Sequence, residues 1–327
     1  MFRTLSRKLV AQWLILGIVL LTLGAEIAGD LYKERMRTES REKDRLQALT
    51  RVIHDNLAGN LAGVYAVLGD LCAEVSRRGH EAGRNERLKT LTRAMPGVRT
   101  MMIFDAAGIV RAANRPELIG SNFSQRAYFQ AVLQRPDALT MYVSPPFRTS
   151  LGLFAINVVR MIPGKRGEFS GIVAATLDPE YFRTLLNSVL YTPDMWVNVT
   201  HESGLQFMMV PEREGQAGKN LAQPGSFFTL HRDSGRQESF LTGRVLATGD
   251  ERMMVWHTIR PVDLKPDNAL IVAVGRDLER SEEACDLPVV GQLRRVRFAF
   301  FNHERMRDAA AGPEKPAAFR FHAVGRD

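Results

Sequence analysis

VRTMMIFDAAGIVRAAN, residues 98–114, consists of two apolar segments on either side of the turn DAAG. Short segments of strand-forming residues separated by Asp and Gly predict a β-hairpin. About a hundred residues later, MWVNVTHESGLQFMMV, residues 195–210, repeats the order of strand, turn and strand. Internal repetition of this length indicates a duplicated structural unit.

The two copies continue in the same order after their hairpins. LIGSNF (118–123) in the first copy corresponds to QAGKNL (216–221) in the second, and GIVAATLD (171–178) corresponds to NALIVAVGR (268–276). Sequential strands joined by short turns predict a mostly antiparallel sheet in each copy. A helix expected near residues 125–134, beginning around Ser124, has no obvious counterpart in the second copy, so we expect the second unit to be smaller.

A long helix is predicted before the first hairpin, over residues 31–94. Its apolar residues recur at intervals of three and four, which places them on one face of a helix. These residues are Leu46, Leu49, Ile53, Leu57, Leu61, Val64, Leu68, Leu71 and Val75. RRGHEAGR (77–84) is expected to interrupt the helix, and the Pro-Gly pair at 96–97 to end it.

The N-terminus contains an apolar stretch from Leu9 to Ala28, preceded by Arg3, Arg7 and Lys8. About twenty such residues are enough to cross a bilayer as one helix, and the cationic flank is expected to stay in the cytoplasm. A cleaved signal peptide is the alternative. The run is long for a signal sequence and small residues at a cleavage site are only weakly present, so an uncleaved anchor is favoured.

Composition excludes some functions. The net charge of +8 comes from basic residues scattered among acidic ones, and no nucleic-acid motif occurs, which argues against nucleic-acid binding. No metal-ligand spacing, nucleotide-binding loop or nucleophile motif is present, so neither a metal, a cofactor nor a catalytic site is predicted. Cys72 and Cys285 are far apart in the sequence, and we expect no disulfide.

The last fifty residues differ from the rest. Arg294, Arg295 and Arg297 stand within the only apolar stretch of this tail, which makes a second membrane crossing costly. We expect the tail to stay outside the membrane and largely unpacked. The predicted organisation is a cytoplasmic segment (1–8), a membrane anchor (9–30), a helical stalk (31–97), two units (98–194 and 195–277) and a tail (278–327).

An anchor, a long helix and two tandem PAS-like units of α+β class resemble the double Cache sensor domain of bacterial chemoreceptors, histidine kinases and diguanylate cyclases. The resemblance covers residues 10–277. Its best local matches are SQRAYFQAVL (124–133), MYVSPPF (141–147), INVVRMI (156–162) and FSGIVAATLDPEYFRTLL (169–186). It implies that the membrane-distal unit, residues 98–194, holds a ligand and that the membrane-proximal unit, residues 195–277, transmits the signal.

The resemblance also implies a binding site. In the amino-acid-binding branch an arginine and two aromatic residues grip the ligand carboxylate, and a later aspartate takes the amine. These positions correspond to Arg126, Tyr128, Phe129 and Asp178. The sequence departs from the branch at Ser121, where an aromatic is expected, and at Phe129, which lacks a tyrosine's hydroxyl.

Two further residues, Tyr142 and Arg160, are predicted to line the same pocket. Each candidate also has a structural interpretation. Arg126 could pair with an acid or carbonyl within the fold, the aromatic residues could belong to the core, and Asp178 could cap the helix that follows it. His54, in VIHDN, faintly resembles a histidine-kinase phosphoacceptor, but a solvated helix histidine is strongly favoured.

The sequence therefore predicts a sensory module, anchored in a bacterial inner membrane, whose periplasmic part binds a small anionic metabolite or an amino acid. Its N-terminal helix would contact membrane lipid, and its long helix would form a homodimer. Two alternatives remain. The chain could be the front part of a diguanylate cyclase or histidine kinase whose catalytic domain is not within these residues, or it could be a ligand-free module for dimerisation.

Overall fold

The computed structural model describes residues 2–78, 83–149, 152–213, 215–246 and 249–277. The described helices are α1 (Phe2–Arg78), α2 (Arg84–Ala94), α3 (Ala127–Gln134), α4 (Pro179–Asn187) and α5 (Phe227–Asp233), with 3-10 turns η1 (Pro116–Leu118) and η2 (Val262–Leu264). The strands of the first unit are β1 (Val98–Asp105), β2 (Val110–Ala113), β3 (Tyr142–Val143), β4 (Phe147–Arg148), β5 (Phe154–Ala155), β6 (Asn157–Pro163) and β7 (Phe169–Leu177). Those of the second unit are β8 (Met195–His201), β9 (Gln206–Val210), β10 (Glu238–Arg244), β11 (Glu251–Ile259) and β12 (Leu270–Asp277). The expectations for the tail and for Cys285 lie outside the described residues.

Helix α1 is continuous from the predicted anchor through the predicted stalk. The predicted apolar stripe is the side of α1 that packs, since eight of its nine residues are buried and Leu49 is partly buried against them. The predicted interruption falls between α1 and α2, where Gly83 precedes α2 with a φ of 92°. Glycine adopts this left-handed conformation without the steric penalty of a side chain.

The two units have the same sheet topology. The first sheet has the order β2-β1-β7-β6-β3, and the second, read from β9, has the equivalent order β9-β8-β12-β11-β10. All of their pairings are antiparallel. The prediction of a duplicated, mostly antiparallel α+β unit is thereby confirmed.

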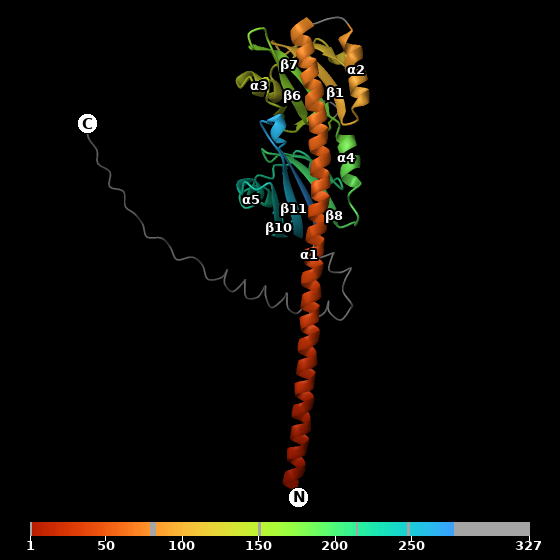
Figure 1. Cartoon of the computed structure of the whole chain (residues 1–327), viewed down its shortest axis with the longest axis vertical. Helices are drawn as coiled ribbons and strands as arrows, with labels where there is room; N and C mark the ends of the chain where they lie inside the picture. The colour runs from red at the N-terminus through yellow and green to blue at the C-terminus, as the bar shows by residue number, and fades with distance from the viewer. Residues whose placement is uncertain (1, 79–82, 150–151, 214, 247–248, 278–327) are drawn as a thin grey trace, which may run out of the picture. The chain divides into compact units, whose positions relative to one another are not determined.

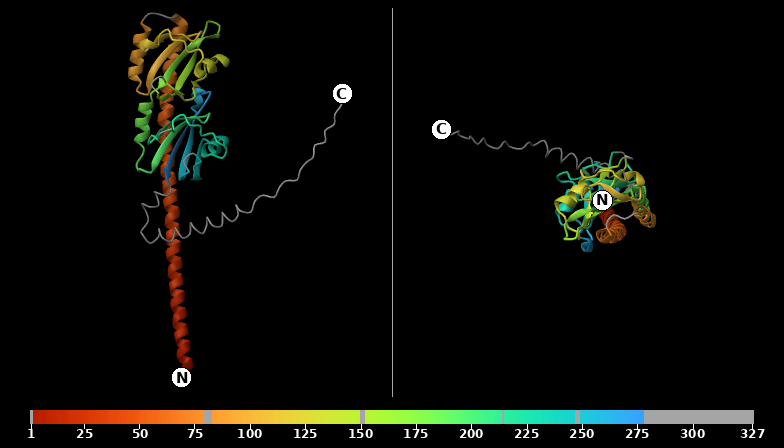
Figure 2. Two further views of the ribbon diagram at one scale, coloured as in Figure 1. Left: turned by 180° about the vertical axis from the view of Figure 1, so that it is seen from behind. Right: turned by 90° about the horizontal axis from the view of Figure 1, so that it is seen from above.

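Each sheet is covered on both faces (Figures 1 and 2). Helix α1 contacts β6 and β7 of the first sheet and β11 and β12 of the second, while α2 and α4 pack beside it. A single hydrophobic core runs along α1 through both units. The opposite faces carry separate cores, one beneath α3 and one beneath α5.

Helix α5 is the counterpart of α3 in the second unit, so the expectation that the second unit lacks this helix was wrong. Ser226 caps it, because its Oγ accepts a hydrogen bond from Thr229 N at 3.2 Å. Phe228 anchors the helix in the core below. At seven residues α5 is too short to show a helical period in the sequence.

The two units contact each other at β3. The backbone N–H of Val143 donates to Asp267 Oδ1 at 2.8 Å, and His201 Nε2 lies 3.2 Å from the carbonyl oxygen of Val143. Burial raises the pKa of Asp267 above its usual range. A carboxylate and an imidazole of the second unit thus hold one residue of the first.

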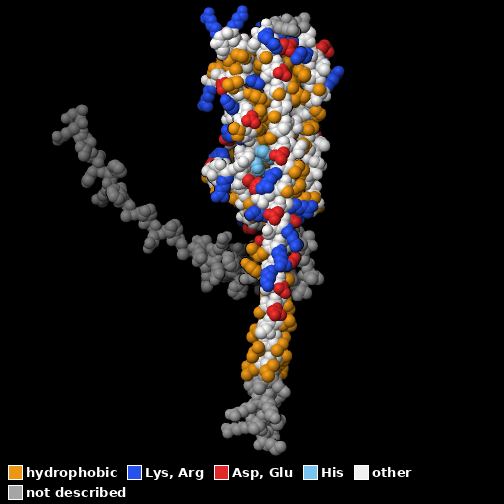
Figure 3. Space-filling model, viewed as in Figure 1, with side chains coloured by type: hydrophobic (Ala, Val, Ile, Leu, Met, Phe, Trp, Pro, Cys, Tyr) orange, Lys and Arg blue, Asp and Glu red, His pale blue; other side chains and the backbone are white. Residues whose placement is uncertain are grey.

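The N-terminal part of α1 exposes apolar side chains, as the orange segment of Figure 3 shows. It contains an 18-residue window of mean hydropathy 2.0 in which no residue is buried in the protein. Large exposed residues here include Trp13, Leu14, Ile18, Leu21 and Ile27. The helix is long and apolar enough to cross a membrane by length and composition.

Candidate functional site

Helix α3 begins three residues later than expected. Asn122 Oδ1 accepts a hydrogen bond from Ser124 N at 2.8 Å, which forms a turn before the helix. Arg126 therefore occupies the N-cap position with an extended backbone, and no side chain caps the helix. The predicted start at Ser124 was wrong because the turn at Asn122 uses the residues that would have formed the first turn.

The Arg126 guanidinium is exposed and makes no ion pair within the described part of the chain. The ring centroid of Phe123 lies 5.9 Å from the guanidinium carbon of Arg126. The backbone carbonyl of Arg126 accepts from Phe129 N and Gln130 N, each at 3.0 Å. Arg126 thus has a fixed backbone and a side chain that is free to meet a ligand, and the internal pairing considered above is not present.

Tyr128 and Phe129 both lie in the core beneath α3, but they differ in surroundings. Phe129 packs its ring edge against Phe169, with centroids 5.6 Å apart. Tyr128 lies between Phe104 and Phe147, with centroid distances of 6.2 and 6.1 Å. Its hydroxyl makes no hydrogen bond to any described residue, and burial raises its pKa while the charge of Arg126 lowers it. Tyr128 therefore offers a neutral hydroxyl, whereas Phe129 is a core residue.

Tyr142 shares this face of the sheet, but its hydroxyl is already used. It donates to the carbonyl of Arg135 and accepts from Asp137 N, which fixes the loop after α3. Its ring belongs to the hydrophobic core beneath α3, which also contains Tyr128 and Phe129.

Arg160 does not join the other candidates. Its neighbours in β6, Val159 and Met161, face α3, so strand alternation directs Arg160 to the α1 side. There its guanidinium lies 4.1 Å from the ring centroid of Tyr65 and donates to the carbonyl of Ala138 at 3.0 Å. The expectation that Arg160 lines the same pocket is corrected by this orientation.

Asp178 follows β7 directly and begins α4. Its Oδ1 accepts from Glu180 N at 3.1 Å, and Pro179 occupies the first helical position. Asp178 is therefore the N-cap residue of α4, as one of the two interpretations expected. Its contact with a ligand amine stays a prediction.

A buried polar row on the α3 face was not anticipated from the sequence. Thr176 pairs with Thr100 on one side and with Asn157 on the other. Asn157 is 1% exposed, and neither its Nδ2 nor its Oδ1 has a hydrogen-bond partner in the described structure. Since a buried amide without a partner is costly, Asn157 is a candidate ligand contact. Its position at the start of an apolar strand gives no signal in a single sequence.

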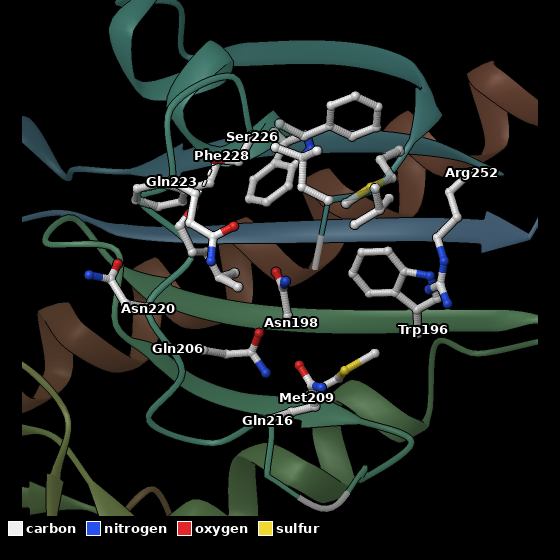
Figure 4. A pocket seen from close by; sticks show the side chains of 16 residues that line it. Trp196, Asn198, Gln206, Met209, Gln216, Asn220, Gln223, Ser226, Phe228 and Arg252 are labelled. Carbon is white, nitrogen blue, oxygen red and sulfur yellow. Dashed lines mark hydrogen bonds between the residues drawn. The ribbon is translucent and has the colours of Figure 1, made fainter. Parts of the chain in front are cut away.

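The second unit contains a pocket on its α5 face, between β8, β9 and α5 (Figure 4). The space between its walls is about 570 Å³ when the solvent-filled mouth is counted with it, so the pocket is a partly open cleft and not a closed cavity. Its walls include Trp196, Asn198, Gln206, Gln223, Phe228 and Trp256.

Charge at this pocket is confined to one arginine. Arg252 is fully buried, and its guanidinium lies 4.8 Å from the ring centroid of Trp196. Its Nη2 donates to Asp250 Oδ2. The pocket is therefore lined mainly by amides, aromatic rings and apolar side chains. The charge of its one lining arginine is compensated by Asp250, although Arg252 Nε has no hydrogen-bond partner among the described residues. Among the described residues, no group of three or more His, Cys, Asp or Glu side chains could hold a metal.

No protein-family model and no curated protein matches the sequence. The structure is similar to the extracellular domain of a putative histidine kinase, rpHK1S-Z16, with a TM-score of 0.65 and 21% identity over 73% of this chain and 96% of that one. It is also similar to the ligand-binding domain of the Pseudomonas aeruginosa amino acid chemoreceptor PctB in complex with L-Arg (TM-score 0.53, 14% identity, 73% and 96% covered). A third similar structure is the ligand-binding domain of the Pseudomonas fluorescens chemoreceptor CtaA in complex with L-isoleucine, with a TM-score of 0.54 and 17% identity over 75% of this chain and 98% of that one.

Proposed function

Because the chain has the fold of extracellular ligand-binding sensor domains of histidine kinases and chemoreceptors, we propose that it is a membrane-anchored sensory module. Its first unit would bind a small molecule bearing a carboxylate. The observation that carries this proposal is the exposed guanidinium of Arg126, which has no ion-pair partner among the described residues, two residues before the unpartnered hydroxyl of Tyr128.

The chemistry of these groups suits a carboxylate. A guanidinium binds a carboxylate through two parallel hydrogen bonds, each contributing about 1.5–3 kcal/mol when a charge takes part. The uncapped N-terminus of α3, next to Arg126, favours an anion as well. The Tyr128 hydroxyl can donate a further hydrogen bond, since its raised pKa keeps the proton in place at neutral pH.

An amino acid is the specific ligand that we propose first. PctB and CtaA were solved with amino acids bound. In this chain Asp178 is the acid proposed to take the amine, and Asn157 offers both a donor and an acceptor on the same face of the sheet. Tyr142 would contribute to the site indirectly, because its hydroxyl holds the loop after α3 through Arg135 and Asp137.

The proposed location follows from α1. Its apolar N-terminal part would cross the inner membrane with the basic end in the cytoplasm, leaving both units in the periplasm. Since α1 continues from the anchor past both sheets, a small sliding or rotation of this helix could transmit ligand binding. Dimerisation through α1 is part of the same proposal.

The proposal is tested by calorimetric titration of the full chain in detergent micelles with amino acids and short carboxylates. We expect saturable binding of at least one of them, and a loss of about tenfold or more in affinity in Arg126→Ala. Arg126→Lys should lose less, because one charge-assisted bond remains. Arg236→Ala, an exposed arginine of the second unit, is the matched control and should bind normally. If no carboxylate binds, or if Arg126→Ala binds as the unaltered protein does, the proposal is wrong.

A further inference from the structure

The second unit places polar side chains where the first unit places apolar ones. Strand pairs β1–β2 and β8–β9 have the same register and a bulge at the same point. This register makes Asn198, Thr200 and Gln206 equivalent to Met102, Phe104 and Val110. The first unit uses its three residues to fill the core beneath α3.

The polar residues of the second unit are buried as deeply as their apolar equivalents. Asn198 is 4% exposed and Gln206 is 2% exposed. Asn198 Oδ1 and Gln206 Nε2 have no hydrogen-bond partner among the described residues. Both side chains line the pocket, and Figure 4 shows their amides at its centre. Two unpartnered buried amides in a core position call for a partner from outside the chain.

The surroundings of the two amides define what that partner can be. Aromatic rings of Trp196, Phe228 and Trp256 form the apolar walls. No carboxylate lines the pocket, and Arg252 is already paired with Asp250. A cation would therefore find no counter-ion here. Arg252 Nε has no hydrogen-bond partner among the described residues, but the positive charge of the arginine is already compensated by Asp250, so an anion gains little from it.

We propose that the second unit has its own ligand site, which binds a small uncharged molecule with a flat apolar body and adjacent hydrogen-bond donor and acceptor groups, such as a carboxamide. The donor would bind Asn198 Oδ1, the acceptor would bind Gln206 Nε2, and the ring would pack against Trp196. The site is separate from the carboxylate site at Arg126 and does not depend on it.

The test uses four probes with the same ring: benzamide, benzoate, benzylamine and toluene. The full chain in detergent micelles is titrated with each probe in a calorimeter. We expect saturable binding of benzamide, with benzoate and benzylamine weaker by about tenfold or more. The pocket has no carboxylate to pair with the ammonium group, and the charge of Arg252 is already compensated by Asp250. Toluene should also bind about tenfold more weakly, since it leaves both amides unpaired.

Variants locate the binding. Asn198→Leu and Gln206→Leu should each reduce benzamide affinity by about tenfold or more, while Asn56→Leu on the exposed face of α1 should not change it. If a leucine variant does not fold, the near-isosteric Gln206→Glu serves instead, since it replaces the Nε2 donor that binds the ligand's acceptor with a carboxylate. Arg126→Ala should leave benzamide binding unchanged, which separates this site from the carboxylate site. Absence of saturable benzamide binding, or equal binding by the leucine variants, would show that water alone satisfies the amides and would overturn the proposal.

Discussion

The imidazole rings of His54 in α1 and His257 in β11 lie with their centroids 4.2 Å apart and their planes tilted by 50°. This contact joins the signalling helix of the proposal to the sheet of the second unit. It also shows that His54 is half-buried against a partner, rather than solvated as the sequence suggested.

The groups around His257 set its proton affinity. The pKa of His257 lies below its usual value, because burial and then the charges of His54 and Arg51 lower it. Glu238 of β10 acts in the opposite direction and raises the pKa, without reversing the shift. His231, from α5, shows the same direction more strongly, because burial and then the charge of His257 lower its pKa to about 4.

We predict that acid destabilises the second unit through these histidines. A histidine whose pKa is lowered by folding binds fewer protons in the folded state, so stability is lost as pH falls below about 6.5, the ordinary value. For His231 the loss is complete near pH 4 and amounts to roughly 3 kcal/mol at most. Thermal midpoints of the full chain, measured from about pH 7 to about pH 5, should fall. Replacing His54 and His257 together with glutamine should reduce this dependence, and an unchanged pH profile in that variant would contradict the prediction.

A second prediction concerns Arg276, which joins the end of β12 to α1. Its Nε lies 2.7 Å from Asp194 Oδ2, and its Nη1 lies 2.7 Å from Glu42 Oε2. Both the arginine and Asp194 are mostly buried, so Arg276→Ala leaves a buried carboxylate without its cation and should cost about 3 kcal/mol. Arg37→Ala, whose pair with Glu34 is well exposed, should cost less than about 1 kcal/mol. Thermal unfolding of both variants measures the difference, and equal effects would show that the Arg276 network does not stabilise the fold.

A third prediction concerns Gly275 of β12, which is paired with Trp196 of the neighbouring strand β8. A Cβ at this glycine would lie 2.7 Å from Trp196 Cζ2, closer than carbon atoms approach. Gly275→Ala should therefore displace the indole, destabilise the protein by about 1–3 kcal/mol and shift the tryptophan fluorescence. Gly63→Ala, in α1 with nothing within 4 Å of its Cβ, should instead stabilise by about 0.5–1 kcal/mol. Normal stability and fluorescence in Gly275→Ala would contradict the packing described.

Local patterns account for what the sequence predicted correctly. The buried side of α1 follows from its apolar spacing, and both hairpins follow from turns that contain Gly108 and Gly204, which adopt φ values of 78° and 94°. The buried polar residues are different. Asn198 and Gln206 lie in short strands covered on both faces, so neither alternation nor composition distinguishes an inward amide from an outward one. Only the register between strands shows where their side chains point.

The last prediction separates the two roles of Asp178. As an N-cap it accepts from Glu180 N, and asparagine performs this role as well as aspartate does. Asp178→Asn should therefore keep the thermal midpoint, while Asp178→Ala should lose about 1 kcal/mol of stability.

The same two variants then report on the ligand amine. If Asp178 pairs with it, Asp178→Asn should weaken amino-acid binding by about tenfold or more and leave a carboxylate without an amine unaffected. Ser226→Ala, which removes the cap of α5 in the other unit, is the control for cap loss alone and should not change binding in the first unit. Calorimetric titration of the full chain gives both affinities. Amino-acid binding that is unchanged in Asp178→Asn would mean that this carboxylate serves α4 alone, and that the amine, if one is bound, is held by neutral acceptors such as Asn157.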